Sequence, residues 1–144
     1  MRLLVAFDGS EGALAALQEA AALARETSAS VIVLRVLNPL VDAADVVAPS
    51  TDAAMLVVTE RARASLSSAI ASAGLDVASV EIEVVECDRG EDVAEVIERV
   101  AGSSGATMIV ISSRRAASIS GAVMGSVTDH VLRNAPCPVL VVPE

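Results

Sequence analysis

The chain has 144 residues, a net charge of −9 and a single aromatic residue, Phe7. That length suits one domain, residues 1–144, with a sizeable core, and the negative charge and near absence of aromatic rings argue against nucleic-acid binding. All ten basic residues are arginine, which excludes enzymes that use a Schiff-base lysine and nucleotide-binding proteins that use the lysine of a Walker loop.

The first half of the chain predicts two strands and two helices. The apolar run 3–7 predicts a strand, and a helix follows it because apolar residues then recur at helical spacing opposite charged ones. The β-branched run 30–36 predicts a strand that is buried on both faces. Residues 38–52 include two prolines and predict a long irregular loop. A second helix is predicted over 53–73, where it ends at a glycine.

The second half continues the alternation of strands and helices. Residues 80–86 alternate in polarity and predict a strand near a sheet edge. A third helix is predicted after Gly90, because apolar residues there fill every position of one helical face. Residues 107–111 predict a buried strand, residues 126–134 a short helix, and residues 137–142 a last strand.

Strict alternation of this kind predicts an α/β domain of three layers, in which helices cover both faces of a parallel sheet. Ligands of such sheets bind beyond the carboxyl ends of the strands, where the order of the strands reverses. Two strand-to-helix loops are candidates for that place, residues 8–10 and residues 112–126.

Polar groups in these two loops have two interpretations each. Asp8 could cap the helix that follows it, or it could hold the hydroxyls of a ribose. Ser10 has the same two interpretations, and capping is favoured more strongly for it than for Asp8. Gly125 and Ser126 begin a helix, where free N–H groups and the helix dipole favour an anion. A Gly-Ser pair also occurs as a plain turn and cap.

The remaining reactive side chains suggest no catalytic or metal centre. Cys87 and Cys137 lack the spacing of metal ligands, and we expect both to be unpaired and buried. His130, the only histidine, is predicted to lie at the surface or at an interface. The chain has no apolar run of about 18 residues and reaches a carboxylate at position 8, so it predicts neither a membrane span nor a secretory signal.

Four stretches of the sequence resemble the universal stress protein family. They are LLVAFDGSEGALAAL, GEDVAEVIERVA, ATMIVISSR and GSVTDHVLRNAPCPVLVV, and they follow the order and spacing of the family along essentially the whole chain. The resemblance implies a Rossmann-like fold of the adenine nucleotide alpha hydrolase type, with a five-stranded parallel sheet in the order 3-2-1-4-5. It also implies homodimers that form through the last strand, 137–142. The absence of a predicted membrane span and secretory signal leads us to expect a cytoplasmic protein.

The resemblance also implies a binding site for ATP between the first and fourth strands. Nucleotide-binding members of the family carry a phosphate motif of Gly, two residues, Gly, nine residues, and Gly-Ser or Gly-Thr. Counting back from Gly125 and Ser126 places Ser112 and Arg115 at the two leading glycine positions. The residues at the implied site are Ala6, Phe7, Asp8, Val36, Ile111, Ser112, Arg115, Gly125, Ser126, Val127 and Thr128.

The two missing glycines favour weakened or lost nucleotide binding. A side chain costs roughly 1 to 2 kcal/mol where the backbone is left-handed, and the long side chain of Arg115 would enter the space of the phosphates. We therefore expect a dimeric stress-response binding protein, not an enzyme, whose ATP binding is weakened or lost.

Two alternatives to that expectation remain open. In the first, the protein holds ATP or AMP between the first and fourth strands, with Arg115 turned toward a phosphate. In the second, it is an ATP-consuming enzyme, which the absence of lysine and of a base near the loops disfavours.

Overall fold

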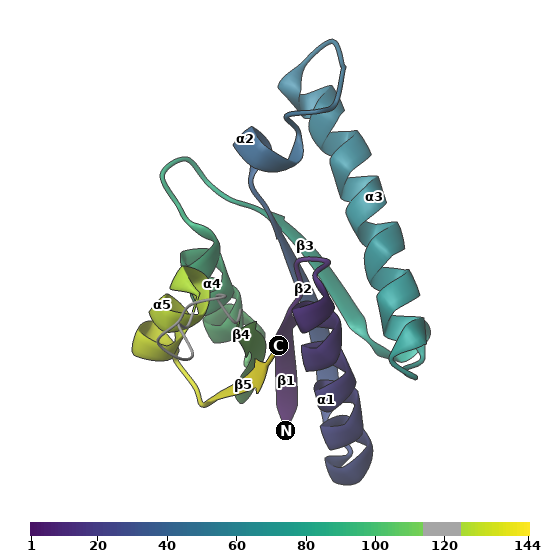
Figure 1. Ribbon diagram of the computed structural model, residues 1–144, viewed down its shortest axis with the longest axis vertical. Coiled ribbons are helices and arrows are strands. Elements are labelled where there is room, and N and C mark those ends of the chain that lie inside the picture. The colour runs from purple at the N-terminus through teal and green to yellow at the C-terminus, as the bar shows by residue number, and fades with distance from the viewer. Residues whose placement is uncertain (114–124) are drawn as a thin grey trace.

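The computed structural model of the protein describes residues 1–113 and 125–144, and Figure 1 shows the arrangement of its helices and strands. The strands are β1 (Arg2–Ala6), β2 (Ser30–Leu37), β3 (Glu81–Glu86), β4 (Met108–Ser113) and β5 (Val139–Pro143). The helices are α1 (Glu11–Thr27), α2 (Pro39–Asp42), α3 (Thr51–Ser72), α4 (Val93–Ser104) and α5 (Ser126–Asn134), with a 3₁₀ turn, η1, at Val77–Ser79.

The five strands form one parallel sheet in the order β3-β2-β1-β4-β5. Val5 at the centre of β1 pairs with Val33 of β2 on one side and with Val110 of β4 on the other. The order of the strands therefore reverses between β1 and β4, which confirms the fold that the sequence predicted. Beyond their carboxyl ends lies the place where such sheets bind ligands.

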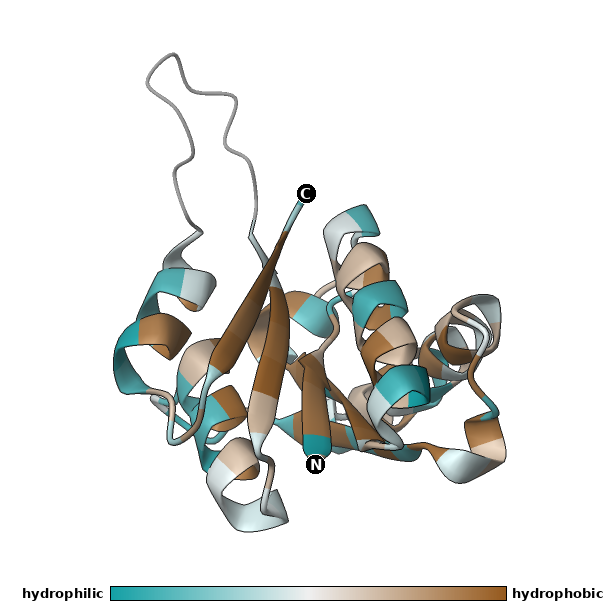
Figure 2. Ribbon diagram, turned by 90° about the horizontal axis from the view of Figure 1, so that it is seen from below, coloured by the Kyte–Doolittle hydropathy of each residue, from teal (hydrophilic) through white to brown (hydrophobic). Residues whose placement is uncertain are grey.

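The two faces of the sheet are covered by different helices, because successive strand residues point to opposite sides. Leu3 and Val5 pack with α1 and α3 on one face, whereas Leu4 packs with α4 and α5 on the other. In Figure 2 the central strands are coloured hydrophobic along most of their length, as expected for a sheet that is covered twice. The core is therefore two aliphatic layers, one on each side of the sheet.

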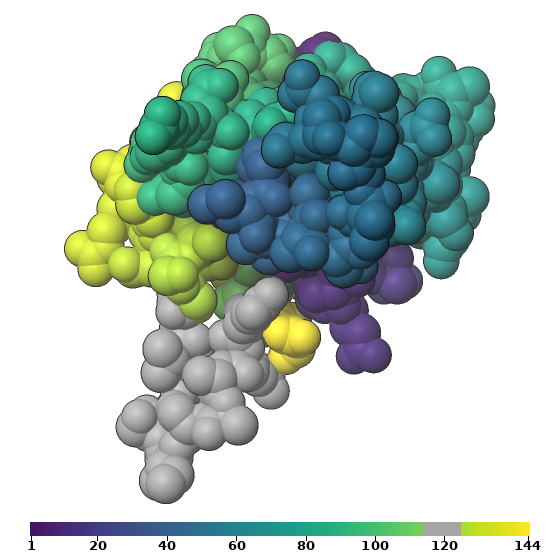
Figure 3. All heavy atoms as spheres, turned by 90° about the horizontal axis from the view of Figure 1, so that it is seen from above, coloured from purple at the N-terminus to yellow at the C-terminus, as the bar shows by residue number. Residues whose placement is uncertain are grey.

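The segment between β2 and α3 contains a short helix, α2, where the sequence predicted only an irregular loop. The side chain of Asn38 caps α2 by accepting a hydrogen bond from the N–H of Leu40, at 3.1 Å. The carboxylate of Asp42 accepts hydrogen bonds from the N–H of Asn38, at 2.7 Å, and from the guanidinium of Arg35, at 3.1 Å. Four residues are too few to show a helical period, which explains why the sequence did not predict α2. Figure 3 looks onto the carboxyl edge of the sheet, where α2 and the chain after it are drawn in blue.

The N-caps of α1 and α4 define where the two helices begin. Ser10, which the sequence favoured as a cap more strongly than Asp8, is the N-cap of α1, and its hydroxyl accepts a hydrogen bond from the N–H of Ala13 at 3.1 Å. α4 begins at Val93, later than Gly90, because the carboxylate of Asp92 caps it. None of the described helices is both long enough and apolar enough to cross a membrane.

Candidate functional site

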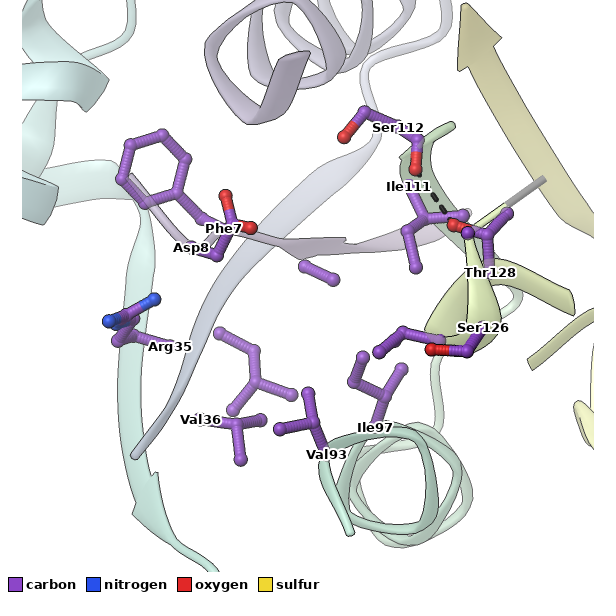
Figure 4. A pocket seen from close by; sticks show the side chains of 14 residues that line it. Phe7, Asp8, Arg35, Val36, Val93, Ile97, Ile111, Ser112, Ser126 and Thr128 are labelled. Carbon is purple, nitrogen blue, oxygen red and sulfur yellow. Dashed lines mark hydrogen bonds between the residues drawn. The ribbon is translucent and has the colours of Figure 1, made fainter. Parts of the chain in front are cut away.

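A pocket of about 310 Å³ lies beyond the carboxyl ends of β1 and β4 (Figure 4). Its walls come from the ends of β1, β2 and β4, from the start of α4, and from the first turn of α5. That volume is within the range of small-molecule and cofactor sites. The lining residues are Ala6, Phe7, Asp8, Leu34, Arg35, Val36, Val93, Ile97, Ile111, Ser112, Gly125, Ser126, Val127 and Thr128.

One side of this pocket is apolar. Val36 and Ile111 reach it from the strands, and Val93 and Ile97 reach it from α4, as Figure 4 shows. All four belong to the core between the sheet and the helices α4 and α5, so the pocket is an opening at the edge of that core. An aliphatic surface of this kind can pack against a flat ring, but it provides no hydrogen bonds to select one.

The opposite side of the pocket is the start of α5. Ser126 is the first residue of this helix, and no side chain of the described residues caps it. Its first N–H groups and the positive end of its dipole therefore remain available to an anion. Asp129 adds a negative charge to the same turn, which opposes an anion, but Arg133 binds this carboxylate at 3.0 Å and reduces the effect.

Thr128 fixes the start of α5 to the sheet. Its hydroxyl donates a hydrogen bond to the carbonyl oxygen of Ser112 at 2.8 Å, and its side chain is buried. The hydroxyl proton is thus already used, so Thr128 positions the helix start and does not donate to a ligand. Gly125 has φ near −59°, a value that any residue adopts, so the helix start does not depend on glycine for its conformation.

Ser112 lies at one of the two positions where the phosphate motif has glycine, and the structure removes the reason to expect strain there. Among the described non-glycine residues only Ser28 has a positive φ, so Ser112 is ordinary strand backbone within β4. Its side chain points toward α1, away from the α5 side of the pocket (Figure 4). Gly12 of α1 makes room for it, because a Cβ at position 12 would lie 3.1 Å from the Ser112 hydroxyl oxygen.

The carboxylate of Asp8 and the guanidinium of Arg35 line the end of the pocket far from Ser126 and Thr128 (Figure 4). One oxygen of Asp8 accepts a hydrogen bond from the N–H of Ser10 at 3.0 Å, which fixes the side chain at the end of β1. Arg35 is held by Asp42 of α2. Acceptors for hydroxyl groups and donors for an anion therefore lie side by side at this end.

Ten of the eleven residues that the sequence placed at the site line this one pocket, and the eleventh, Arg115, lies outside the described residues. Sequence reasoning missed Leu34, Arg35, Val93 and Ile97. Leu34 and Arg35 directly precede the predicted Val36 on β2, so their position in the sequence could have identified them as pocket residues. Val93 and Ile97 looked like ordinary core positions of an amphipathic helix.

The thiols and the histidine lie outside this pocket. Burial raises the pKa of the Cys87 and Cys137 thiols, which are half-buried and unpaired, not fully buried as expected. His130 is hydrogen-bonded to Glu98 of α4 at 2.7 Å. Within residues 1–113 and 125–144, no three His, Cys, Asp or Glu side chains gather as a metal site.

The fold and the site define an α/β protein of Rossmann-like type, with its pocket where the strand order reverses. A sequence profile of the universal stress protein family matches residues 1–143. The chain belongs to this family.

Known proteins of similar sequence and structure agree with that assignment. The chain is 28% identical to the universal stress protein YxiE of Bacillus subtilis, over 98% of this chain and 97% of that protein. A universal stress family protein of Burkholderia pseudomallei has a solved structure that matches with 32% identity and a TM-score of 0.69, over 99% of this chain and 96% of that one. A universal stress protein solved in complex with cAMP matches with 22% identity and a TM-score of 0.64, over 99% of this chain and 96% of that one.

Proposed function

We propose that the chain is a stress-response binding protein that holds an adenine nucleotide, ATP or AMP, in the pocket between β1 and β4. The observation that carries the proposal is the combination, in one pocket, of an aliphatic side, a carboxylate at Asp8 and the uncapped start of α5 at Ser126. One protein of the same fold was solved with cAMP, an adenine nucleotide. At 22% identity that likeness concerns the fold, so the residue roles here come from this chain alone.

Each part of a nucleotide has a counterpart in the pocket. The base packs between Val36 of β2 and Val93 and Ile97 of α4. The ribose hydroxyls donate to the carboxylate of Asp8, and the phosphates accept hydrogen bonds from the first N–H groups of α5 at Ser126. The aliphatic side supplies affinity, and the two polar ends set the direction of the ligand.

Ser112 is no obstacle to this binding mode, because its backbone is unstrained and its side chain points toward α1. The hypothesis of weakened or lost binding then depends on Arg115 alone, which lies outside the described residues. We favour retained nucleotide binding over the weakened binding that the missing glycines suggested, because the described residues of the pocket offer a partner to each part of a nucleotide.

We propose binding and regulation as the role of the pocket, without catalysis. Burial disfavours the thiolate forms of Cys87 and Cys137, because it raises the pKa of both thiols. His130 binds Glu98 between α4 and α5 and does not line the pocket. Within residues 1–113 and 125–144, Asp8 is then the only lining residue of the pocket with a carboxylate, and we assign it to the ribose.

The substitution Ser126→Glu tests the phosphate end of the pocket. A carboxylate at the first position of α5 is favourable for the helix, but it repels a phosphate at the same N–H groups. Calorimetric titration should show ATP and AMP binding weakened by at least about tenfold, or about 1.4 kcal/mol, whereas adenosine binding should change little.

The matched control is Thr51→Glu, which places the same charge at the first residue of α3, away from the pocket. This variant should bind ATP and AMP as the parent does. Failure of the parent to bind either nucleotide would overturn the proposal, as would equal binding of ATP by the parent and by the Ser126→Glu variant.

We also propose that the protein forms homodimers through β5, the strand that the sequence predicted at residues 137–142. β5 is an edge strand that pairs with β4 alone among the described strands. It is short and apolar, and Leu140 is 36% exposed. An open apolar edge favours pairing with a second copy, and Pro143 at its end limits how far such pairing can extend.

A further inference from the structure

A second, smaller pocket of about 200 Å³ adjoins the first at the carboxyl edge of the sheet. It lies on the other side of the β1 end, against α3, and it shares Phe7, Asp8 and Arg35 with the first pocket. Its other lining residues are Gly9, Leu37, Val58, Arg61, Ala62, Ser65 and Leu66. A ligand at Asp8 in the first pocket is therefore next to the second.

Two positively charged side chains line the second pocket. Arg35 from β2 and Arg61 from α3 both line it, together with the hydroxyl of Ser65 one turn further along α3. Arg61 has no hydrogen bond or ion pair with any other described residue. Arg35 uses one nitrogen for Asp42, which leaves further N–H groups of its guanidinium for a ligand. Two arginines beside one cavity are notable in a chain with a net charge of −9.

The second pocket is smaller than the first, at about 200 Å³ against about 310 Å³. This space is large enough for a phosphate group. Arginine is well suited to a phosphate, because its planar group can donate two parallel hydrogen bonds.

We propose that the second pocket binds a phosphate carried on the ribose of the nucleotide in the first pocket. This inference rests on the proposed function and deepens it, because it names the class of ligand as a nucleotide phosphorylated on its ribose as well as at its 5′ end. Asp8 lies on the wall between the pockets, so a ribose whose hydroxyl donates to Asp8 presents its 2′ and 3′ positions to Arg61 and Arg35. In dinucleotide-binding folds, a carboxylate binds the ribose hydroxyl of one ligand, whereas a nearby arginine accommodates the phosphate on the ribose of another. Asp8 lines the second pocket as well, so the contacts of the phosphate with Arg61 and Arg35 must outweigh its repulsion by this carboxylate.

Calorimetric titration with AMP, adenosine 2′,5′-bisphosphate and adenosine 3′,5′-bisphosphate tests the inference. At least one bisphosphate should bind about tenfold or more tightly than AMP, as expected for a charge-assisted contact with arginine. Arg61→Gln should remove most of that difference and leave AMP binding within about twofold of the parent. Arg61 is exposed and unpaired among the described residues, so the variant should fold normally.

Arg63→Gln is the matched control, because Arg63 is also exposed on α3 but does not line either pocket. It should bind every nucleotide as the parent does, which excludes a general effect of lost positive charge. A second readout is the side-chain Nε–H resonance of Arg61, which should shift when the preferred bisphosphate is added and stay in place when AMP is added.

The outcomes separate this inference from the function on which it rests. If AMP binds and neither bisphosphate binds more tightly, the inference is wrong and the proposed function stands. If a bisphosphate binds more tightly but Arg61→Gln leaves the difference intact, the second pocket is not the site. If neither AMP nor either bisphosphate binds, the proposed function and the inference both fail.

Discussion

The imidazole of His130 joins two helices that cover the same face of the sheet. Its Nδ1 lies 2.7 Å from a carboxylate oxygen of Glu98, so α5 is connected to α4 by a polar contact as well as by packing. The hydrogen bond to Glu98 raises the pKa of His130, and the negative charges of Glu98, Asp92 and Glu95 act in the same direction, while partial burial opposes them. The pair is thus strongest when the imidazole is protonated.

The His130 contact should make the stability of the fold depend on pH. A raised pKa in the folded protein means that the contribution is complete below the ordinary histidine pKa of about 6.5 and is lost as the pH rises through the raised value. Thermal unfolding of the parent and of His130→Gln should therefore differ more at low pH than at high pH. Because the chain has one histidine, NMR can follow its titration directly, and Glu98→Gln should lower its pKa. Equal melting differences across the pH range would contradict this account.

One face of helix α3 is buried against the sheet, and the opposite face is exposed to solvent. Leu66 and Ile70 are fully buried against the sheet, whereas Leu56 on the same helix is 70% exposed. Leu66 also lines the second pocket, so its packing helps to fix the position of the preceding part of α3, which carries Arg61. The same residue type thus occurs in two environments on one helix, which allows a direct comparison.

Leu66→Ala should lower the free energy of unfolding by about 2 to 5 kcal/mol, because it removes the contacts of a fully buried side chain. Leu56→Ala should change it by less than about 0.5 kcal/mol, since the exposed side chain loses little contact. Urea denaturation of both variants measures the two values. Similar losses in the two variants would show that α3 does not pack as described.

The sequence predicted those elements whose residues repeat a pattern, and it missed features that depend on where elements meet. The continuous β-branched run of β2 and the helical period of the apolar face of α4 are both visible in the sequence, so both elements were predicted. That Arg61 lines the second pocket could not be predicted, because nothing in the spacing of α3 shows that this turn faces the end of β1. The direction of the Ser112 side chain could not be predicted either. Side chains alternate between the two faces of β4, but the sequence does not show that α1 covers the face to which Ser112 points.

At the scale of the whole molecule, the net charge of −9 acts against the dimer that β5 favours. Light scattering at micromolar concentration should give about twice the chain mass of 14.6 kDa. Raising the ionic strength from about 0.01 to 0.15 M should strengthen the dimer, because the screening length falls from about 30 to 8 Å.

Leu140→Glu should give the mass of a single chain, since it brings like charges together where the edge strands of two copies meet. Leu56→Glu, on an exposed face of α3, serves as the control for the added charge and should remain dimeric. A parent protein with the mass of one chain would contradict pairing through β5.

The close approach of Gly12 to Ser112 means that these two positions share one space. A Cβ at position 12 would lie 3.1 Å from the hydroxyl oxygen and 3.2 Å from the Cβ of Ser112. A side chain at position 12 would therefore push the Ser112 side chain aside by a few tenths of an ångström, and it would also lie 3.3 Å from the carboxyl carbon of Glu144. In chains related to this one, we expect the sizes of the residues at the positions of Gly12 and Ser112 to change together.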